Sequence, residues 1–311
     1  MIRRIRAALV CAAMVAGWPA FAEEGPLTLD ELATAFGWDF ESAEITVQTL
    51  GEDFYVLFGV GGNIAVSIGD DGTLIVDDQF PQMMDRIDDA LAALGSDGID
   101  FAINTHWHFD HADGNLALGP RGTWLVSQTN SRAMMADPHV VNLVSVQYLQ
   151  EPYPLEARPV ITYDDRMRFH FNGETVDLMH FGPAHTTGDT AVIFRNRNAV
   201  HLGDVFNNSG YPFIDADNGG SIDGVIEFCS SVLEELEEGA TVIPGHGPVT
   251  DGQALADYVA MLTVVRDRIK AMIGEGKSLV EVIAARPTAE FDERYGDPAL
   301  LVNRAYVSLS R

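Results

Sequence analysis

The sequence predicts an α/β fold, a four-layer αβ/βα sandwich in which two β-sheets stack between outer layers of helices. Strand patterns occur in two runs, and helical patterns follow each run. About 289 residues remain after a predicted N-terminal signal, which is enough for one large core. No Pro/Ser-rich linker or repeat divides them. We therefore expect one domain over residues 23–311.

The first run consists of short strands separated by glycine turns. Strands are predicted at residues 45–50, 54–60, 64–68 and 73–77, a helix at 81–94, and a further strand at 99–104. Helical patterns follow near residues 128–136 and 140–149.

The second run repeats one pattern: an apolar strand, a glycine-rich turn and a polar side chain. The strands at 175–181, 199–204 and 241–243 lead to His185, Asp204 and His246. Glycine lets the backbone approach a bound group because no Cβ stands in the way. Helices are predicted at 221–236 and 253–273, and the C-terminal helices, about residues 278–311, are expected to pack outside with a structural role.

The segment His106-Trp107-His108-Phe109-Asp110-His111 places three imidazoles and a carboxylate in six residues, at the end of the strand at 99–104. Zinc binds neutral imidazole and carboxylate, and a catalytic zinc site keeps one position open for water. Four ligands are too many for one such site, so the spacing predicts two metal ions side by side. The alternative, a polar surface loop with histidines by chance, does not explain this density of ligands.

These motifs, in this order, resemble those of the metallo-β-lactamase superfamily of zinc hydrolases over about residues 45–250. The resemblance implies the four-layer architecture, with the site at the edge where the sheets meet. It also implies two Zn²⁺ per chain: one held by His106, His108 and His185, a second held by Asp110, His111 and His246, and Asp204 bridging them. The other histidines, His139, His170, His180 and His201, are expected to be ordinary buried or surface residues.

Two positions depart from many β-lactamases of the superfamily. Those enzymes carry Cys or Ser where this chain has Asp204, and a Lys where it has Asn207. A bridging aspartate resembles the glyoxalase II, lactonase and phosphodiesterase branches. The resemblance therefore supports the metal site more strongly than a β-lactam substrate.

We expect a zinc-dependent hydrolase that attacks the carbonyl of a β-lactam or a related cyclic amide or ester with a zinc-held hydroxide. Zinc lowers the pKa of bound water to about 7, so no Ser or Cys nucleophile is needed, and Asp110 would orient the hydroxide and take up its proton. Lactonase, thioesterase or phosphodiester hydrolase activity is the alternative within the superfamily. Two other classes of protein are less favoured. A flavodiiron-type protein would need an additional flavin-binding domain, which we do not expect in this chain. A non-catalytic metal-binding accessory protein would be expected to have lost ligands, whereas all seven are present here.

Three further residues are candidates for supporting roles. Asp77 ends the strand at 73–77 and is expected to orient a ligand imidazole through its free N–H. Asn207 and Tyr211 follow Asp204 in a loop that should line the pocket, and either is a candidate hydrogen-bond partner of the substrate. Trp107 and Phe109 are expected to shield the site or to pack beneath it.

Residues 1–22 are typical of a cleavable secretory signal, with three arginines, an apolar stretch at 7–16 and an Ala20-Phe21-Ala22 cleavage site. About ten apolar residues are too few to span a ~30 Å bilayer core. We expect a periplasmic or secreted protein with no stable membrane insertion after cleavage.

Cleavage would change the formal net charge from −27 to −30, because only three arginines are lost. That field repels nucleic acid and anionic lipid, so a small-molecule substrate and no nucleic-acid partner are expected. Cys229 alone would remain, and we expect it to be a buried small hydrophobe.

Overall fold

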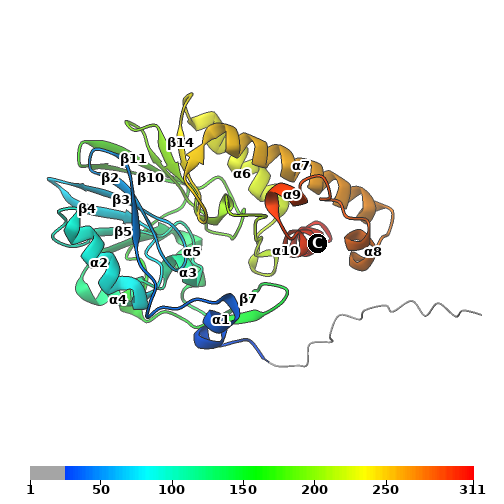
Figure 1. The fold of residues 1–311 in the computed structure, drawn as a ribbon, viewed down its shortest axis with the longest axis horizontal. Helices are drawn as coiled ribbons and strands as arrows, with labels where there is room; N and C mark the ends of the chain where they lie inside the picture. Colours follow the sequence, from blue (N-terminus) through cyan, green and yellow to red (C-terminus); the bar gives the residue numbers. More distant parts are fainter. Residues whose placement is uncertain (1–24) are drawn as a thin grey trace, which may run out of the picture.

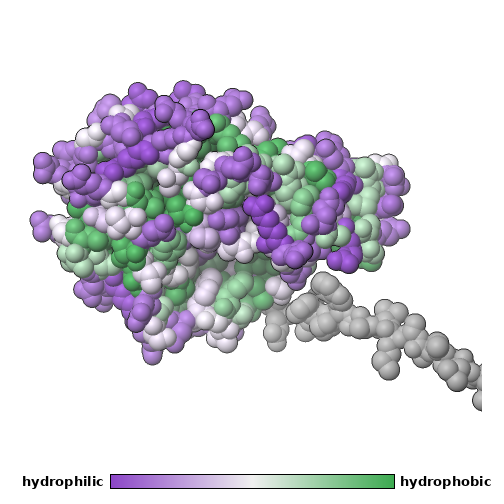
Figure 2. All heavy atoms as spheres, turned by 45° about the horizontal axis from the view of Figure 1, so that its top comes forward, coloured by the Kyte–Doolittle hydropathy of each residue, from purple (hydrophilic) through white to green (hydrophobic). Residues whose placement is uncertain are grey.

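The computed structural model describes residues 25–311, in which two β-sheets stack face to face and helices cover both outer faces (Figure 1). This confirms the predicted α/β sandwich. The predicted signal, residues 1–22, lies outside the described residues. Figure 2 shows a face on which hydrophilic residues alternate with patches of apolar residues.

The first sheet has seven strands in the order β1-β2-β3-β4-β5-β6-β9. Their bounds are β1 (Thr46–Gly51), β2 (Phe54–Phe58), β3 (Ile64–Gly69), β4 (Gly72–Val76), β5 (Phe101–Ile103), β6 (Trp124–Gln128) and β9 (Ile161–Tyr163). Strands β1 to β4 form an antiparallel meander, and β4, β5, β6 and β9 run parallel. Within β4, Leu74 and Val76 face the second sheet while Ile75 faces the helices, the period-2 alternation of a strand that is buried on both sides.

The second sheet has six strands in the order β10-β11-β12-β13-β14-β15. Their bounds are β10 (Arg166–Phe171), β11 (Glu174–Met179), β12 (Ala191–Phe194), β13 (Ala199–His201), β14 (Thr241–Ile243) and β15 (Thr250–Asp251). Only β13 and β14 pair in parallel. Apolar side chains fill the space between the sheets, where Phe54 and Phe194 pack with their ring centroids 4.7 Å apart.

The helices form the two outer layers. On the first sheet and beside the site these are α1 (Leu29–Phe36), α2 (Met84–Ala93), α3 (Phe109–Ala112), α4 (Asn115–Arg121) and α5 (Thr129–Met134). On the second sheet these are α6 (Ile222–Glu235), α7 (Gly252–Gly274), α8 (Leu279–Ala284), α9 (Asp292–Tyr295) and α10 (Ala299–Leu309). Short 3-10 helices lie at Pro81–Met83, Leu155–Ala157, Gly203–Val205 and Ala216–Asn218.

The outer layers bury the remaining faces of the sheets. Ile87 and Leu91 of α2 pack on the first sheet, whereas Val225 and Cys229 of α6 pack on the second. Cys229 is fully buried, as expected. Within residues 25–311, none of the helices combines the length and the apolar character needed to cross a membrane.

The helix predicted near residues 140–149 is wrong. This segment is a hairpin of β7 (His139–Asn142) and β8 (Gln147–Gln150), in which Val141 pairs with Tyr148. Val141 and Tyr148 are buried whereas Val140 is exposed, which is strand alternation rather than a helical stripe. Val144 has a φ of +67°, which ends any helix at the turn.

Candidate metal centre

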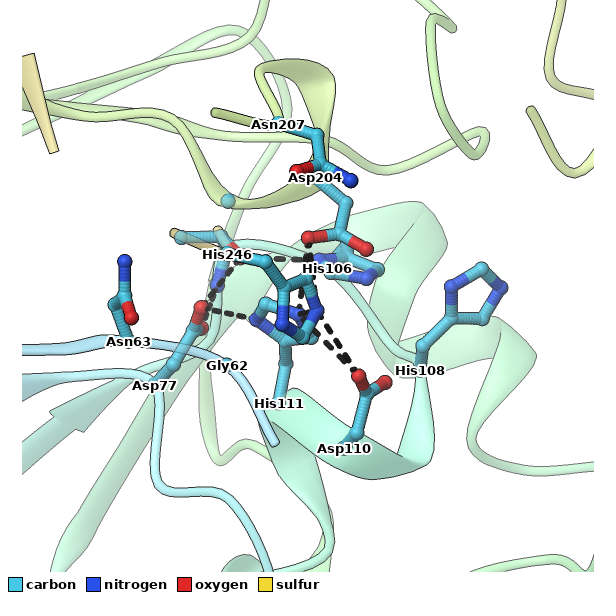
Figure 3. Close-up of polar contacts among 12 residues, drawn as sticks. Gly62, Asn63, Asp77, His106, His108, Asp110, His111, Asp204, Asn207 and His246 are labelled. Carbon is cyan, nitrogen blue, oxygen red and sulfur yellow. Dashed lines mark hydrogen bonds and ion pairs between the residues drawn. The ribbon is translucent and has the colours of Figure 1, made fainter. Parts of the chain in front are cut away.

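The seven side chains predicted to bind metal lie together at one edge of the sandwich. Figure 3 labels all of them except His185. Each follows a strand of one of the two sheets. The set consists of His106, His108, Asp110 and His111 after β5, His185 after β11, Asp204 after β13 and His246 after β14. The rigid strands therefore fix where these loops begin, which is the usual way in which a fold holds a site.

A first set of donors consists of His106, His108 and His185. Their facing ring nitrogens all lie within 4.8 Å of one another, and Nδ1 of His108 is 2.8 Å from Nε2 of His185. All three side chains are buried. Three imidazole nitrogens at this spacing match a zinc site that leaves a fourth position open.

A second set consists of Asp110, His111 and His246, whose donor atoms also lie within 4.8 Å of one another. Oδ2 of Asp110 is 3.1 Å from Nε2 of His246. Asp204 lies between the two sets: Oδ1 is 3.1 Å from Nε2 of His111, and Oδ2 is 3.9 Å from Nε2 of His185. One carboxylate thus faces both sets.

Hydrogen bonds hold three of the imidazoles so that one nitrogen of each stays free toward the cluster. Nδ1 of His111 donates to Oδ2 of Asp77 at 2.7 Å, Nε2 of His108 donates to Oδ2 of Asp215 at 2.9 Å, and Nδ1 of His185 donates to the carbonyl oxygen of Phe213 at 2.9 Å. These bonds assign the tautomers, so that the opposite nitrogens present their lone pairs inward.

His106 gives an independent test of whether a metal fits. Its Nε2 is buried and has no hydrogen-bond partner in the part of the chain that the structure describes. A buried polar atom without a partner costs about 1–3 kcal/mol, and this one points into a cluster of imidazole and carboxylate donors. The residues therefore fit a zinc ion, which would supply the missing partner.

The electrostatics of the cluster favour a cation. Burial lowers the pKa of His106 and of His185, which keeps both in the neutral form that binds metal. Burial also disfavours a charged His246, but the carboxylates of Asp204 and Asp110 outweigh it and raise its pKa to about 10. The two carboxylates therefore create a strongly negative environment at the second set.

Two glycines make room for the second set. A Cβ on Gly62 would collide with the ring of His111, and a Cβ on Gly245 would collide with Oδ1 of Asp204. Asn63 ties the same two segments together, because its Nδ2 donates to the carbonyl oxygens of Pro244 (2.8 Å) and Gly247 (2.9 Å). This clamp holds the turn that carries His246 against the first sheet.

Asp77, which was predicted to orient a ligand imidazole, lies beneath His111 and contacts its Nδ1. Its Oδ1 accepts from the Thr105 backbone N–H at 2.7 Å, and its Oδ2 accepts from Thr105 Oγ1 at 2.8 Å. Asp77 is fully buried and has a φ of +64°, a region that few non-glycine residues occupy. The backbone is thus shaped to direct this carboxylate at the ligand loop.

Sequence reasoning missed two aspartates that shape the cluster. Asp215 contacts His108, and its backbone N–H donates to the carbonyl oxygen of His185. Asp189 accepts hydrogen bonds from the backbone N–H groups of Ala184 and Thr186, which fixes the loop around His185. The Gly188-Asp189 pair at the end of segment 182–189 could have indicated Asp189 from the sequence. No sequence pattern marks Asp215 in the same way.

A cavity of about 200 Å³ opens beside the candidate ligands and is lined in part by Asn207. Oδ1 of Asn207 accepts from Ser209 N–H and Oγ–H, which turns the amide so that Nδ2 has no acceptor among the described residues. The prediction for Tyr211 is wrong: it does not line this cavity. Its hydroxyl instead donates to Thr288 O and Asp292, because α9 packs over it.

The remaining aromatic and histidine residues lie around the cluster. Trp107 is fully buried, and Phe109 packs on Tyr148 of the hairpin and also borders the cavity. The four histidines outside the motifs are not part of the candidate ligand sets. Three make other contacts: His139 packs on Trp107, His180 donates to Asp189 O, and His201 donates to Asn63 O.

Solved structures with similar folds include metallo-beta-lactamases. The metallo-beta-lactamase from Pontibacter korlensis has a TM-score of 0.58 and 14% identity, with 71% of this chain and 99% of that chain covered. The DIM-1 metallo-beta-lactamase has a TM-score of 0.57 and 17% identity, with 71% and 97% covered. At these identities the likeness shows the fold.

A sulfatase is also similar. The stereoselective inverting sec-alkylsulfatase Pisa1 from Pseudomonas sp. has a TM-score of 0.64 and 13% identity, and the match covers 84% of this chain and 50% of that chain. A search of curated proteins finds no match. The family described as "Metallo-beta-lactamase superfamily" matches residues 58–246, well over half of the sequence and all seven candidate ligands. The chain belongs to the metallo-beta-lactamase superfamily.

Proposed function

We propose that this protein is an exported dinuclear zinc hydrolase that attacks the carbonyl of a β-lactam or a related cyclic amide or ester. The observation that carries the proposal is the pair of donor sets joined by Asp204. His106, His108 and His185 would hold one zinc, and Asp110, His111 and His246 the other. The sequence of residues 1–22 supports export to the periplasm or the medium.

Zinc, when bound, lowers the pKa of a coordinated water to about 7 and polarises a carbonyl oxygen. The chain supplies the remaining functions. Asp110 borders the cavity with its carboxylate 14% exposed, so it can orient the attacking water and accept its proton. Asp77 and Asp215 fix the rings of His111 and His108, and Nδ2 of Asn207 is a donor for the substrate.

Lactonase, thioesterase or phosphodiester hydrolase activity is the second candidate, and Asp204 and Asn207 favour it over β-lactam cleavage. A bridging aspartate and a neutral amide stand where many β-lactamases of the superfamily have a thiolate or hydroxyl and a lysine. The similar sec-alkylsulfatase adds sulfate esters to the substrates worth assaying.

The test is a panel of chromogenic β-lactam, lactone, thioester, phosphodiester and sulfate ester substrates against zinc-loaded protein. We expect turnover of at least one carbonyl compound, abolished by a chelator and restored by zinc. Turnover of a phosphodiester or sulfate ester alone would replace the carbonyl assignment. No turnover of any substrate by protein that holds two zinc ions would favour a non-catalytic metal-binding accessory protein.

A further inference from the structure

The cavity beside the candidate ligands has one strongly apolar wall. The apolar residues that line the cavity are Phe36, Trp38, Phe109, Val141, Leu143 and Phe213, and the candidate ligands and Asn207 complete the lining. None of the described residues that line the cavity is a lysine or an arginine. An anionic group of a bound molecule would therefore meet no basic side chain there.

The apolar wall is built before any ligand arrives. Trp38 stacks on Phe36 with ring centroids 5.2 Å apart and packs on buried Phe80 at 5.4 Å. Phe213 stacks on the ring of His108 at 5.8 Å. Aromatic pairs at these distances hold one another in place, so the wall presents a fixed apolar surface.

The hairpin that contributes Val141 and Leu143 is tied down at three points. Nδ2 of Asn218 donates to Val140 O at 3.0 Å, Nδ2 of Asn142 donates to Oδ2 of Asp217 at 3.0 Å, and Leu27 N–H donates to Gln147 O at 2.7 Å. Asn218 also donates to Asp215, the partner of His108. The hairpin is thus anchored to the same short helix that orients a candidate metal ligand.

The charges around the cluster leave no excess of positive charge. The carboxylates of Asp77, Asp110, Asp204 and Asp215 formally offset two Zn²⁺ ions, because the histidines bind as neutral imidazoles. The chain as a whole carries a net charge of −27. An anionic substrate would be repelled on approach and would meet no basic side chain in the cavity.

We infer that the substrate is an uncharged lactone or ester with an apolar group that packs against Phe36, Trp38 and Phe213; the inference rests on the proposed carbonyl hydrolysis. Nδ2 of Asn207 supplies a neutral donor for the polar end of such a molecule. Water adds to the acyl carbon, the acyl–oxygen bond breaks, and the released alkoxide oxygen takes up a proton. The product carboxylate then finds no basic partner in the cavity, which promotes its release.

The experiment compares a pair of alkyl lactones that differ only in a carboxylate at the end of the chain. We expect kcat/KM to be at least about tenfold higher for the neutral member. For the neutral lactone, kcat/KM should rise by up to about fourfold for each methylene added to the alkyl chain, until the chain covers the apolar wall. Trp38→Ala should lower kcat/KM for the neutral lactone by about tenfold or more. Trp124→Ala is the matched control, since Trp124 is 54% exposed and does not line the cavity.

Asn207→Lys tests the charge argument by adding a basic side chain to the lining of the cavity. It should raise kcat/KM for the carboxylated lactone relative to the neutral one by about tenfold. Zinc content measured on each variant checks that the metal cluster is unchanged. Unchanged or weakened use of the carboxylated lactone by this variant would count against the inference.

Binding gives a readout that does not depend on turnover. Calorimetric titration with γ-lactams that carry the same two chains should show tighter binding of the neutral one, weakened by Trp38→Ala and not by Trp124→Ala. Equal or tighter binding of the carboxylated lactam, or faster cleavage of the carboxylated lactone, would overturn the inference while leaving carbonyl hydrolysis intact. Absence of all carbonyl turnover would overturn the proposed function instead, and the titration would still decide which ligand the cavity prefers.

Discussion

Oδ2 of Asp215 lies 2.9 Å from Nε2 of His108, a contact between residues 107 positions apart in the sequence. It turns Nδ1 of His108 toward the cluster, whereas His106, His111 and His185 present Nε2. Asp215 immediately precedes the short helix Ala216–Asn218. This helix is also hydrogen-bonded to the β7–β8 hairpin. A single turn therefore sets both a candidate metal ligand and one wall of the cavity.

Asp215→Ala should weaken zinc binding about 10- to 100-fold, because the ring of His108 loses the acceptor that fixes its tautomer and orientation. Asp215→Asn should weaken it less, since an amide oxygen still accepts the Nε2 hydrogen bond. Competition with a chromophoric chelator measures both affinities. Asp223→Asn on α6 is the control, because this exposed carboxylate pairs with Arg266 away from the cluster. Wild-type zinc affinity in Asp215→Ala would show that the contact does not orient the ligand.

Metal analysis of the purified protein should give about two zinc ions per chain. Removal by a chelator should abolish hydrolysis and lower the thermal midpoint, because a ligand that binds only the folded state stabilises it. Added zinc should restore both properties. One zinc ion per chain in metal-replete protein would contradict the dinuclear proposal and would leave Asp110 and Asp204 without the roles given to them.

Asp110→Asn should keep most of the metal and lower kcat by about 10²–10⁴-fold, the usual contribution of a positioned general base. The amide retains an oxygen donor for zinc but is a poor proton acceptor, so the loss falls on the transition state and not on binding. Steady-state kinetics with zinc content measured in parallel separates the two effects. A rate within a few-fold of wild type would mean that another group accepts the proton.

The local parts of the site were predictable from the sequence because they are short motifs. Asp77 and the seven candidate ligands stand at or just after strands, where periodicity and glycine turns mark them. Asp215, the Phe213 carbonyl and the Asn63 clamp were not predictable, since each acts across a contact that only the folded chain creates. The Asn63–Pro244 bond joins positions 181 residues apart. The role predicted for Tyr211 was wrong for the same reason, because its hydrogen-bond partners, Thr288 and Asp292, lie far away in the C-terminal part of the sequence.

The fold was predicted well where strands alternate with glycine turns and less well elsewhere. Strand β10 was missed although Met167, Phe169 and Phe171 alternate with polar neighbours, which is a clear period-2 signal. The β7–β8 hairpin was mistaken for a helix because a short apolar segment fits both periods. Tertiary contacts stabilise the hairpin, in which Tyr148 packs on Phe109 with ring centroids 4.5 Å apart.

Asp204 is the position at which this chain departs from many β-lactamases of its superfamily, so its substitution tests the bridge most directly. Its two oxygens face different donor sets, Oδ1 toward His111 and Oδ2 toward His185. Asp204→Ala should therefore loosen both zinc ions, not only the second, and lower activity on every substrate. Asp204→Cys should restore part of the zinc binding, because thiolate is a good zinc ligand, but a single sulfur cannot reproduce two separated oxygens. Stoichiometry and stepwise affinities for zinc in the two variants provide the measurement. Loss of only one zinc ion in Asp204→Ala, with the other held at wild-type affinity, would show that Asp204 serves one site and does not bridge.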